Sequence, residues 1–550
     1  MDEYYLLGTL SNYIDNFNDS KFCEFINKYN TNYLLIYPLI AVELGCFKDV
    51  PHSMDNLLKR CVAGYVYSQT CKFGKELTLK TFNRKSFNKF LGLYDKFLLP
   101  LYQNYRFARE INDINHLTKA KLTEKSEGTY YLTTSLVTDK YKEENFYFYG
   151  VDDATQTNLE KRQIEFLYMS FYKKIMIETQ KITDLVVNID TELYNLCVEI
   201  VRKDINKWQS DVKSSVFSHS KQLADVIGYL YYQAMLVKIS YNIRFLVTQD
   251  IDRYLPEMIL KLDKKETISR ISKISGLDSF KVEGIINYLI NRGNLNFLEF
   301  PLFEVEDYLI SVPSLILAND WSFTIINGHY TKDILIKNRD KNISTITENR
   351  LDTYLKSIVN IATAKVKQYV FIDEENKEHA SDIDYAIYDM NSNMILIIEA
   401  KWIDNHYIDE IDIRYGKVLN TFNKIFNRQI PKHMKFLGQK ENINWLFTGD
   451  KRFKISSEKP DIKYLAVDKR NQLHIDSKHM VSEYMLIYFL KKYTSGNILD
   501  LPSFWAEIET MHTKVEYIKV SDDYLKIDIS DQETIYVEDN DVSLNLKIGN

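Results

Sequence analysis

Hydrophobic positions in the first half of the chain recur mostly at three- and four-residue steps, the spacing of one helix face. Residues 158–203 and 219–247 both show this spacing. No proline occurs between Pro100 and Pro256, so few residues there would break a helix. We therefore expect residues 1–250 to form a mostly helical scaffold or oligomerisation region, interrupted by an irregular polar stretch at 119–157.

Shorter elements are expected between residues 264 and 313. Two helices come first, one at 266–274 and one that begins after the capping residue Asp278. Two strand-like runs follow them, at 295–300 and at 307–312. This order resembles a winged helix, which would either contact DNA or serve as a structural connector. The second helix carries only two cations, Lys281 and Arg292, and also Glu283, whereas a helix that reads a DNA groove normally presents more basic or amide side chains.

Apolar runs typical of strands dominate the region after residue 342. The expected elements are an amphipathic helix, three strands, a second helix and two strands, at 344–364, 367–372, 381–389, 394–402, 409–427, 443–448 and 462–467. This order predicts a mixed α/β unit over residues 342–470.

The last part of the chain, residues 477–550, combines a helix with short strand-like segments, at 477–493, 524–529, 534–537 and 543–548. Residues 521–541 contain eight carboxylates and one lysine, so this small β appendage is acidic. The acidic residues would either solvate a sheet edge and keep it from pairing or compete with DNA for a basic groove.

The composition predicts a folded protein of several domains. With 550 residues, of which 45% are hydrophobic and 27% charged, the chain is long enough for about three or four soluble domains. Its net charge of −6 excludes a wholly basic nucleic-acid coat protein but permits a local basic groove. Five cysteines without CxxC spacing and an acidic start at Met1–Tyr4 predict a reduced, cytoplasmic protein without a secretion signal. We expect no membrane span, because no window of about 18 residues is uninterruptedly apolar.

Two charged residues, Glu399 and Lys401, end an otherwise apolar strand. Residues two apart share one face of a strand, so both side chains point the same way. The turn at 391–393 would fold this strand back on residues 381–389 as a hairpin and bring Asp384 beside Glu399. The sequence therefore predicts two carboxylates and one lysine at one point.

This trio suits the hydrolysis of phosphodiester bonds. Two carboxylates are hard ligands for Mg²⁺, which keeps its other positions for water and phosphate oxygens. The ion would polarise the phosphate and lower the pKa of a water, while the lysine orients that water and stabilises charge on the phosphate. Mg²⁺ is therefore the expected cofactor, with Mn²⁺ as an alternative.

The acid-x-lysine tripeptide alone selects poorly, because it also occurs elsewhere in the chain. The strongest competitor is Asp461 with Lys463, which opens a strand, but its upstream carboxylate would be Asp450 in a lysine-rich loop. Only the pair at 399–401 ends a long apolar strand, follows a strand with a carboxylate at hairpin distance and precedes an amphipathic helix.

Residues 342–470 resemble the PD-(D/E)XK nuclease superfamily, which has the restriction-endonuclease-like fold. The core of that family has the order helix, three strands, helix, strand and an Asp…Glu-x-Lys signature, which Asp384, Glu399 and Lys401 match. The resemblance implies that Asp384 and Glu399 hold Mg²⁺, assisted by the Ala400 carbonyl. It also implies that Lys401 serves the attacking water.

Two further positions concern the same resemblance. Many members of the superfamily add a catalytic glutamate on the first helix, for which Glu348 is the candidate, but Thr345–Glu348 is equally a helix-capping box. Ile383 precedes the first acid where the family's name has proline. His379 and His406 fit no metal-ligand spacing, so we expect both to be surface residues.

A basic run follows the candidate strand. Residues 414–440 contain seven cations and neither Asp nor Glu, in a chain of net negative charge. Arg414, Lys417, Lys424 and Arg428 fall near one face of the predicted helix. They would either contact nucleic-acid phosphates or form an ordinary solvated face.

The expected architecture is a multidomain α + α/β protein with a helical N-terminal half, a winged-helix-like connector, a restriction-endonuclease-like α/β core and a small β appendage. The expected function is that of a metal-dependent endonuclease acting on DNA, in restriction or anti-phage defence. We expect the helical half to form a homodimer through its surplus apolar residues. The rival hypothesis is a non-enzymatic nucleic-acid-binding or interaction protein with an inactive nuclease fold.

Overall fold

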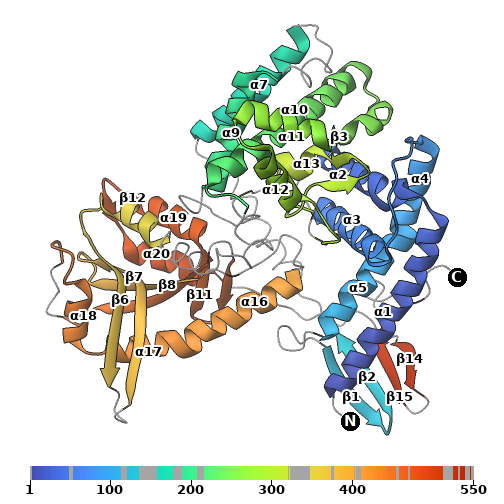
Figure 1. Ribbon diagram of the computed structural model, residues 1–550. Helices are drawn as coiled ribbons and strands as arrows, with labels where there is room; N and C mark the ends of the chain where they lie inside the picture. The colour runs from blue at the N-terminus through green and yellow to red at the C-terminus, as the bar shows by residue number, and fades with distance from the viewer. Residues whose placement is uncertain are drawn as a thin grey trace.

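The computed structural model describes most of the chain in two halves, one mainly helical and one α/β (Figure 1). The helical half ends near residue 321 and the α/β half begins at residue 347. The residues outside the description are 1–2, 49–53, 113–119, 135–157, 178–188, 207–215, 296, 320, 322–346, 373–376, 402, 404–410, 454–457, 469–470, 512–523, 531–532, 539–545 and 547–550. The architecture is therefore mixed helical and α/β, as predicted.

Long helices form the N-terminal half. They are α1 (Glu3–Lys28), α2 (Tyr37–Lys48), α3 (Met54–Lys72), α4 (Arg84–Leu93), α5 (Leu99–Asn112), α7 (Asn158–Ile177), α9 (Thr191–Ile205) and α10 (Ser220–Thr248). The predicted helices at 158–203 and 219–247 are confirmed where the structure describes them, the first as α7 and α9 on either side of residues 178–188, which lie outside the description. Over its first two-thirds α10 is buried on almost all sides, so its buried surface is wider than the single face that the spacing predicted, and it includes the polar residues Gln222, Asp225 and Gln233. Within the described residues, no helix combines the length and the apolar character needed to cross a bilayer.

A buried glutamate joins three elements of this half. Glu43 on α2 is fully buried and accepts hydrogen bonds from Lys238 and Tyr241 of α10 and from the backbone N–H of Ser314. Ser314 lies in α13 (Pro313–Leu317), so one carboxylate connects α2, α10 and α13. A buried charge is tolerated only when it is paired and hydrogen-bonded, which these three donors achieve.

The predicted winged-helix-like order is present in part. β3 (Leu260–Asp263), α11 (Lys264–Ser275), α12 (Ser279–Leu289), β4 (Phe303–Val305) and β5 (Tyr308–Ser311) follow one another, and the three strands pair in the order β3-β5-β4. Asp278 caps α12, as predicted, by accepting from the N–H of Phe280. The strand predicted at 295–300 is wrong, since the described residues there form turns. The apolar run at this position supplies Phe297 and Leu298 to the N-terminal core and does not form a strand.

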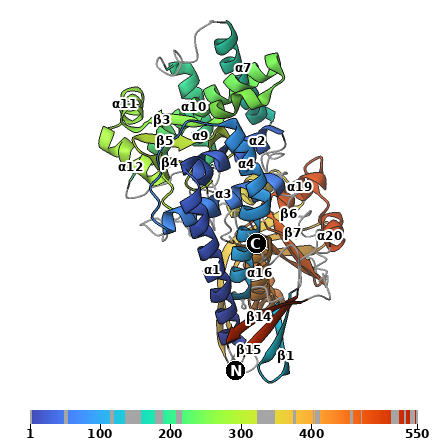
Figure 2. The same ribbon diagram turned by 90° about the vertical axis from the view of Figure 1, so that its right-hand side faces the viewer.

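A small four-stranded sheet joins two segments that are about 400 residues apart in the chain. β1 (Ala120–Ser126) and β2 (Thr129–Thr134) form a hairpin, β14 (Tyr524–Ser530) and β15 (Glu533–Glu538) form another, and β15 pairs parallel with β2. Figure 2 shows this sheet beside the N-terminal end of α1. The irregular stretch predicted at 119–157 is thus wrong for residues 120–134, because their pairing partner lies far along the chain. Of the strand predicted at 543–548, only Leu546 lies inside the described residues.

The α/β half contains a six-stranded mixed sheet. Its strands are β6 (Ile361–Ile372), β7 (Glu378–Asp389), β8 (Met394–Lys401), β9 (Asp461–Asp468), β10 (Leu473–Ile475) and β11 (Lys478–Ser482). Their order is β10-β11-β9-β8-β7-β6, with β8, β9 and β11 parallel to one another. The predicted sequence of helix, three strands, helix and strand is therefore present.

Helices cover both faces of this sheet (Figure 1). One face packs against the helix at 347–355, α19 (Glu483–Lys492) and α20 (Leu501–Glu509). The other face packs against a continuous helical stretch formed by α16 (Ile411–Lys424), the π-helical turn η5 (Ile425–Gln429) and α17 (Ile430–Phe436). The separate helix α18 (Lys440–Phe447) packs on the same face. The end of β8 that carries Glu399 and Lys401 is thus covered by α17 on one face of the sheet.

Three predicted elements of this half are wrong in type or extent. The helix predicted at 344–364 ends at residue 355 among the described residues, because residues 361–364 begin β6 and pair with β7. The strand predicted at 443–448 is the helix α18, whose buried Ile443, Leu446 and Phe447 also have helical spacing. The helix predicted at 477–493 begins only at Glu483. Residues 478–482 form β11 and extend the sheet beyond the predicted boundary at residue 470.

Candidate functional site

The predicted hairpin of β7 and β8 is confirmed, and it sets the position of Asp384. The two strands pair antiparallel up to Tyr385↔Ile398, so Asp384 and Glu399 are the next residues on each strand. On its other side β7 pairs with β6, but that ladder is interrupted where Val366 stands level with Asp384. Val366 has a φ of 43°, a left-handed conformation that is rare for a β-branched residue. Asp384 therefore lies just past the end of the ladder with β8 and at the interruption of the ladder with β6, which allows its carboxylate to turn towards β8.

Asp384, Glu399 and Lys401 meet at this end of the hairpin. The Lys401 Nζ lies 3.4 Å from Asp384 Oδ2 and 3.1 Å from Glu399 Oε2, so one ammonium bridges two carboxylates. The backbone N–H of Ala400 donates to Asp384 Oδ2 at 2.9 Å. The side chain of Glu399 is 1% exposed, whereas those of Asp384 and Lys401 are 14% and 29% exposed. The cluster is thus reached from solvent on the side of Asp384 and Lys401.

Burial and the neighbouring charges change the titration of Asp384 and Lys401. Burial, and after it the charge of Glu399, raise the pKa of Asp384 from 3.8 to about 6, although Lys401 and the Ala400 N–H act in the opposite direction. Burial would lower the pKa of Lys401, but Glu399 and Asp384 outweigh burial and raise it. At neutral pH the Asp384 carboxylate is therefore ionised and the Lys401 amine is protonated.

The donor set fits a hard divalent cation such as Mg²⁺. Carboxylates from two adjacent strands already share one positive group, the Lys401 ammonium. The Ala400 carbonyl, between Glu399 and Lys401, is the third candidate ligand. Within the described residues no three His, Cys, Asp or Glu side chains surround a common point, so water and substrate oxygens would complete the shell. Mg²⁺ usually keeps several waters in this way.

Glu348, the remaining candidate acid, is buried on the helix at 347–355. That helix places Leu351 and Leu355 in the apolar cluster of Tyr385, on one face of the sheet. Ile397, which precedes Glu399 by two residues, belongs to the cluster on the opposite face. A catalytic role of Glu348 therefore stays a prediction.

The four predicted nucleic-acid-binding residues lie on one helical stretch, α16 and η5. Lys424 and Arg428 are exposed, and Lys417 is half-buried. Arg414 belongs to α16, but its side chain lies outside the described residues. Lys432, further along the same stretch, donates to the carbonyl of Ala380 on β7 at 3.3 Å. The basic stretch thus runs past the strand that carries Asp384.

Two buried residues beside the trio were missed by the sequence analysis. His433 on α17 is 0% exposed, and its Nε2 lies 2.8 Å from Glu399 Oε1. Its Nδ1 lies 2.6 Å from the hydroxyl of Tyr369 on β6, which is also buried. One signal was present, because His433 continues the apolar face that includes Phe426 and Ile430. A histidine on such a face needs a buried polar partner.

His379 and His406 were both expected to be surface residues. His379 is half-buried, with its ring stacked on Phe371 at 5.1 Å between centroids, so it is only partly a surface residue. His406 lies outside the described residues.

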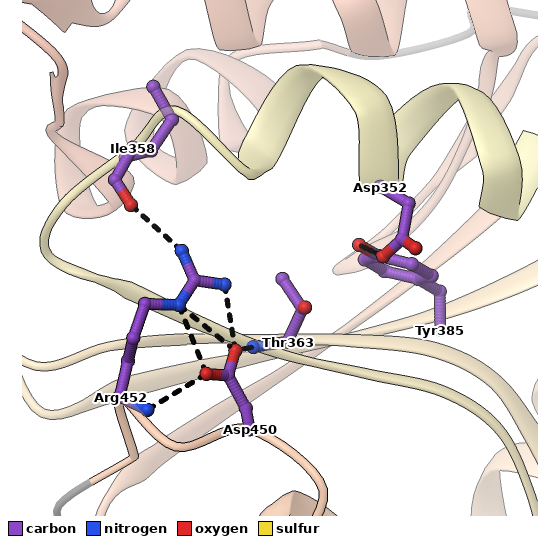
Figure 3. Close-up of polar contacts among 6 residues, drawn as sticks. All are labelled: Asp352, Ile358, Thr363, Tyr385, Asp450 and Arg452. Carbon is purple, nitrogen blue, oxygen red and sulfur yellow. Dashed lines mark hydrogen bonds and ion pairs between the residues drawn. The ribbon is translucent and has the colours of Figure 1, made fainter.

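The competing pair, Asp461 and Lys463, has a different setting. Their ion pair of 3.3 Å lies at the exposed start of β9. The upstream carboxylate, Asp450, is engaged elsewhere: Arg452 Nη2 lies 2.7 Å from it, and the N–H of Thr363 donates to it at 2.9 Å (Figure 3). Asp450 therefore fastens a loop to the start of β6, a structural role.

A scan against protein-family models gave no match, and comparisons with curated proteins and with solved structures gave none either.

Proposed function

We propose that this protein is a Mg²⁺-dependent nuclease that hydrolyses phosphodiester bonds in DNA. In this proposal residues 342–470 belong to the PD-(D/E)XK superfamily, and the biological role is restriction or anti-phage defence. The observation that carries it is the convergence of Asp384, Glu399 and Lys401, in which one ammonium bridges two carboxylates at 3.4 and 3.1 Å. The order of helices and strands around the trio supports the same proposal.

Each member of the trio has a distinct chemical role. Mg²⁺ bound by Asp384 and Glu399 would polarise the scissile phosphate and lower the pKa of a nearby water. The Lys401 ammonium can donate a hydrogen bond to the attacking water and stabilise the negative charge that develops on the phosphate. The Ala400 N–H holds Asp384 against β8, so its carboxylate keeps one orientation. Because Glu399 is buried, bulk water screens these interactions little.

The choice of a polyanionic substrate rests on the helical stretch beside the trio. Lys424 and Arg428 are exposed on it, and the run from 414 to 440 contains no acidic residue to offset them. Exposed cations along one helix can contact successive phosphates of a nucleic acid.

The test is incubation of the purified full chain with plasmid, linear duplex DNA, single-stranded DNA and RNA, in Mg²⁺ or in EDTA. We expect cleavage of DNA with Mg²⁺ and none with EDTA. Lys401→Ala should lower the rate by about 10² or more, because it removes the charge that orients the water. Lys463→Ala, the matched change in the competing acid-x-lysine pair, should cleave like the wild type. Cleavage that persists in EDTA, or that Lys463→Ala abolishes and Lys401→Ala does not, would refute this assignment.

The rival function, nucleic-acid binding without cleavage, is favoured by one observation. The two helices and three strands at 260–311 resemble a winged helix in their order, which supports this rival. At the start of α12 this unit exposes Phe280, next to Lys281 and near Glu283, so its surface is only weakly basic. A protein that binds duplex DNA but cleaves none of the four substrates would favour this rival.

A further inference from the structure

A chain of buried hydrogen bonds lies behind Glu399. The Tyr369 hydroxyl is 2.6 Å from His433 Nδ1, and His433 Nε2 is 2.8 Å from Glu399 Oε1. All three side chains are at most 5% exposed, and they come from β6, α17 and β8. Three separate elements thus converge on the carboxylate that the proposed metal site uses.

Each of the two ring nitrogens of His433 lies within hydrogen-bond distance of one buried partner. When the carboxylate of Glu399 accepts from Nε2–H, Nδ1 is left as an acceptor for the Tyr369 hydroxyl. Burial raises the pKa of Tyr369, and the charge of Glu399 adds to this effect, so the hydroxyl keeps its proton. The Tyr369 hydroxyl, the two nitrogens of His433 and Glu399 Oε1 therefore form one continuous chain of contacts.

The two oxygens of Glu399 consequently have different surroundings. Oε1 is held by His433, while Oε2 faces Lys401 at 3.1 Å. A glutamate side chain has three rotatable bonds, and a carboxylate held at one oxygen loses most of that freedom. The held oxygen directs the other one towards the side where Asp384 also lies.

We propose that His433 and Tyr369 are positioning residues that orient Glu399 for the divalent cation. This inference rests on the proposed nuclease function, because it concerns the same site. Neither residue touches substrate in this proposal. Both act through the carboxylate, as the partners behind metal ligands commonly do.

A purely structural role is the competing explanation. Tyr369 stacks on Phe436 with 3.9 Å between ring centroids, so its ring also helps to pack α17 on the sheet. Tyr369→Phe separates the two roles, because it keeps the ring and removes only the hydroxyl. Tyr385→Phe is the matched control. Tyr385 is buried on the neighbouring strand, and its hydroxyl donates to Asp352 at 3.0 Å on the other face of the sheet (Figure 3).

The experiment measures binding of Mn²⁺ to the full chain without nucleic acid, by electron paramagnetic resonance of the free ion, together with the unfolding temperature. His433→Ala should weaken Mn²⁺ binding by about 10- to 100-fold, the usual effect of losing a partner behind a metal ligand. His433→Gln should recover part of this loss, because its amide can donate to Glu399 again. Tyr369→Phe should weaken binding by a smaller factor, and Tyr385→Phe should leave it unchanged.

The outcomes separate this inference from the proposed function. If the wild type binds no Mn²⁺ and cleaves no DNA, the metal site itself is refuted. If the wild type binds Mn²⁺ and cleaves, and Tyr369→Phe and a folded His433→Ala bind it equally well, only the positioning role is overturned. Should His433→Ala fail to fold, Tyr369→Phe against Tyr385→Phe decides, since both are buried tyrosines that lose only a hydroxyl. Equal loss of Mn²⁺ binding in those two variants would also overturn the role.

Discussion

Replacing Asp384 with Asn should stabilise the metal-free protein at neutral pH. The pKa of Asp384 is raised from 3.8 to about 6 by burial and by Glu399, so the folded protein holds this proton more tightly than the unfolded chain does. Above pH 6 both states lose the proton, and the folded state then bears the cost of a buried carboxylate beside another. Asn has a similar shape without the charge, and therefore removes that cost.

The size of the effect follows from the shift in pKa. A rise of about two units corresponds to about 3 kcal/mol in the free energy of unfolding at about pH 7.5. The sign follows from the direction, because a raised carboxyl pKa costs stability as the pH rises from 3.8 through 6. The advantage of Asp384→Asn should therefore shrink to about 1 kcal/mol at about pH 4.5 and vanish at lower pH.

The stability of this unit within a large protein can be measured by hydrogen exchange of peptides from β7 and β8. The measurement is made in EDTA between about pH 5 and 8, and the rates are corrected for intrinsic exchange. Asp450→Asn is the control of opposite sign. Burial raises the pKa of Asp450, but its hydrogen bonds with Arg452 outweigh burial and lower it, so that variant should lose stability at neutral pH. A pH-independent effect of Asp384→Asn, or a loss of stability at neutral pH without metal, would refute the reasoning.

Three further substitutions and one measurement on the unchanged protein test the site and other parts of the molecule. Glu399→Gln should raise the Mg²⁺ concentration needed for half-maximal cleavage or abolish cleavage, which a metal titration measures; an unchanged midpoint would contradict the ligand role. Lys424→Glu with Arg428→Glu should weaken DNA binding and reduce its salt dependence by roughly 0.9 in log–log slope per lost contact, measured by anisotropy against Lys491→Glu as a surface control. Glu43→Gln should lower the free energy of unfolding of the helical half by about 2 kcal/mol, because three donors lose a charged acceptor; a denaturant titration that matches the wild type would argue against this. Light scattering at micromolar concentration should show a dimer, and a monomer would remove the expected role of the helical half.

The trio could be predicted because its geometry is local. A short turn joins β7 and β8, and the alternation of side chains along a strand then fixes which residues share a face. Given Glu399 and Lys401 at the end of an apolar run, Asp384 was the only carboxylate in its strand at hairpin distance from Glu399. Local pairing of this kind leaves the sequence few alternatives.

The partners of the trio could not be predicted, because their contacts are distant in sequence. His433 is separated from Glu399 by 34 positions, and its place depends on how α17 packs on the sheet. The same reason explains α18, where three buried residues at 443, 446 and 447 suit a short strand or a helix equally until tertiary packing decides. The hairpin at 120–134 likewise has a pattern that becomes informative only beside β15.

The small sheet made by β1, β2, β14 and β15 has a consequence for biosynthesis. β2 leaves the ribosome roughly 400 residues before β15, which pairs with it, and at ~5–20 residues per second this is a delay of roughly 20 to 80 s. During that time Leu132 and the apolar side of α1 lack Ile535 and Val537, which later cover them. The nascent chain therefore carries an open strand edge for most of its synthesis. A stalled or shortened product would keep this edge, so we expect such products to depend on chaperones or to aggregate.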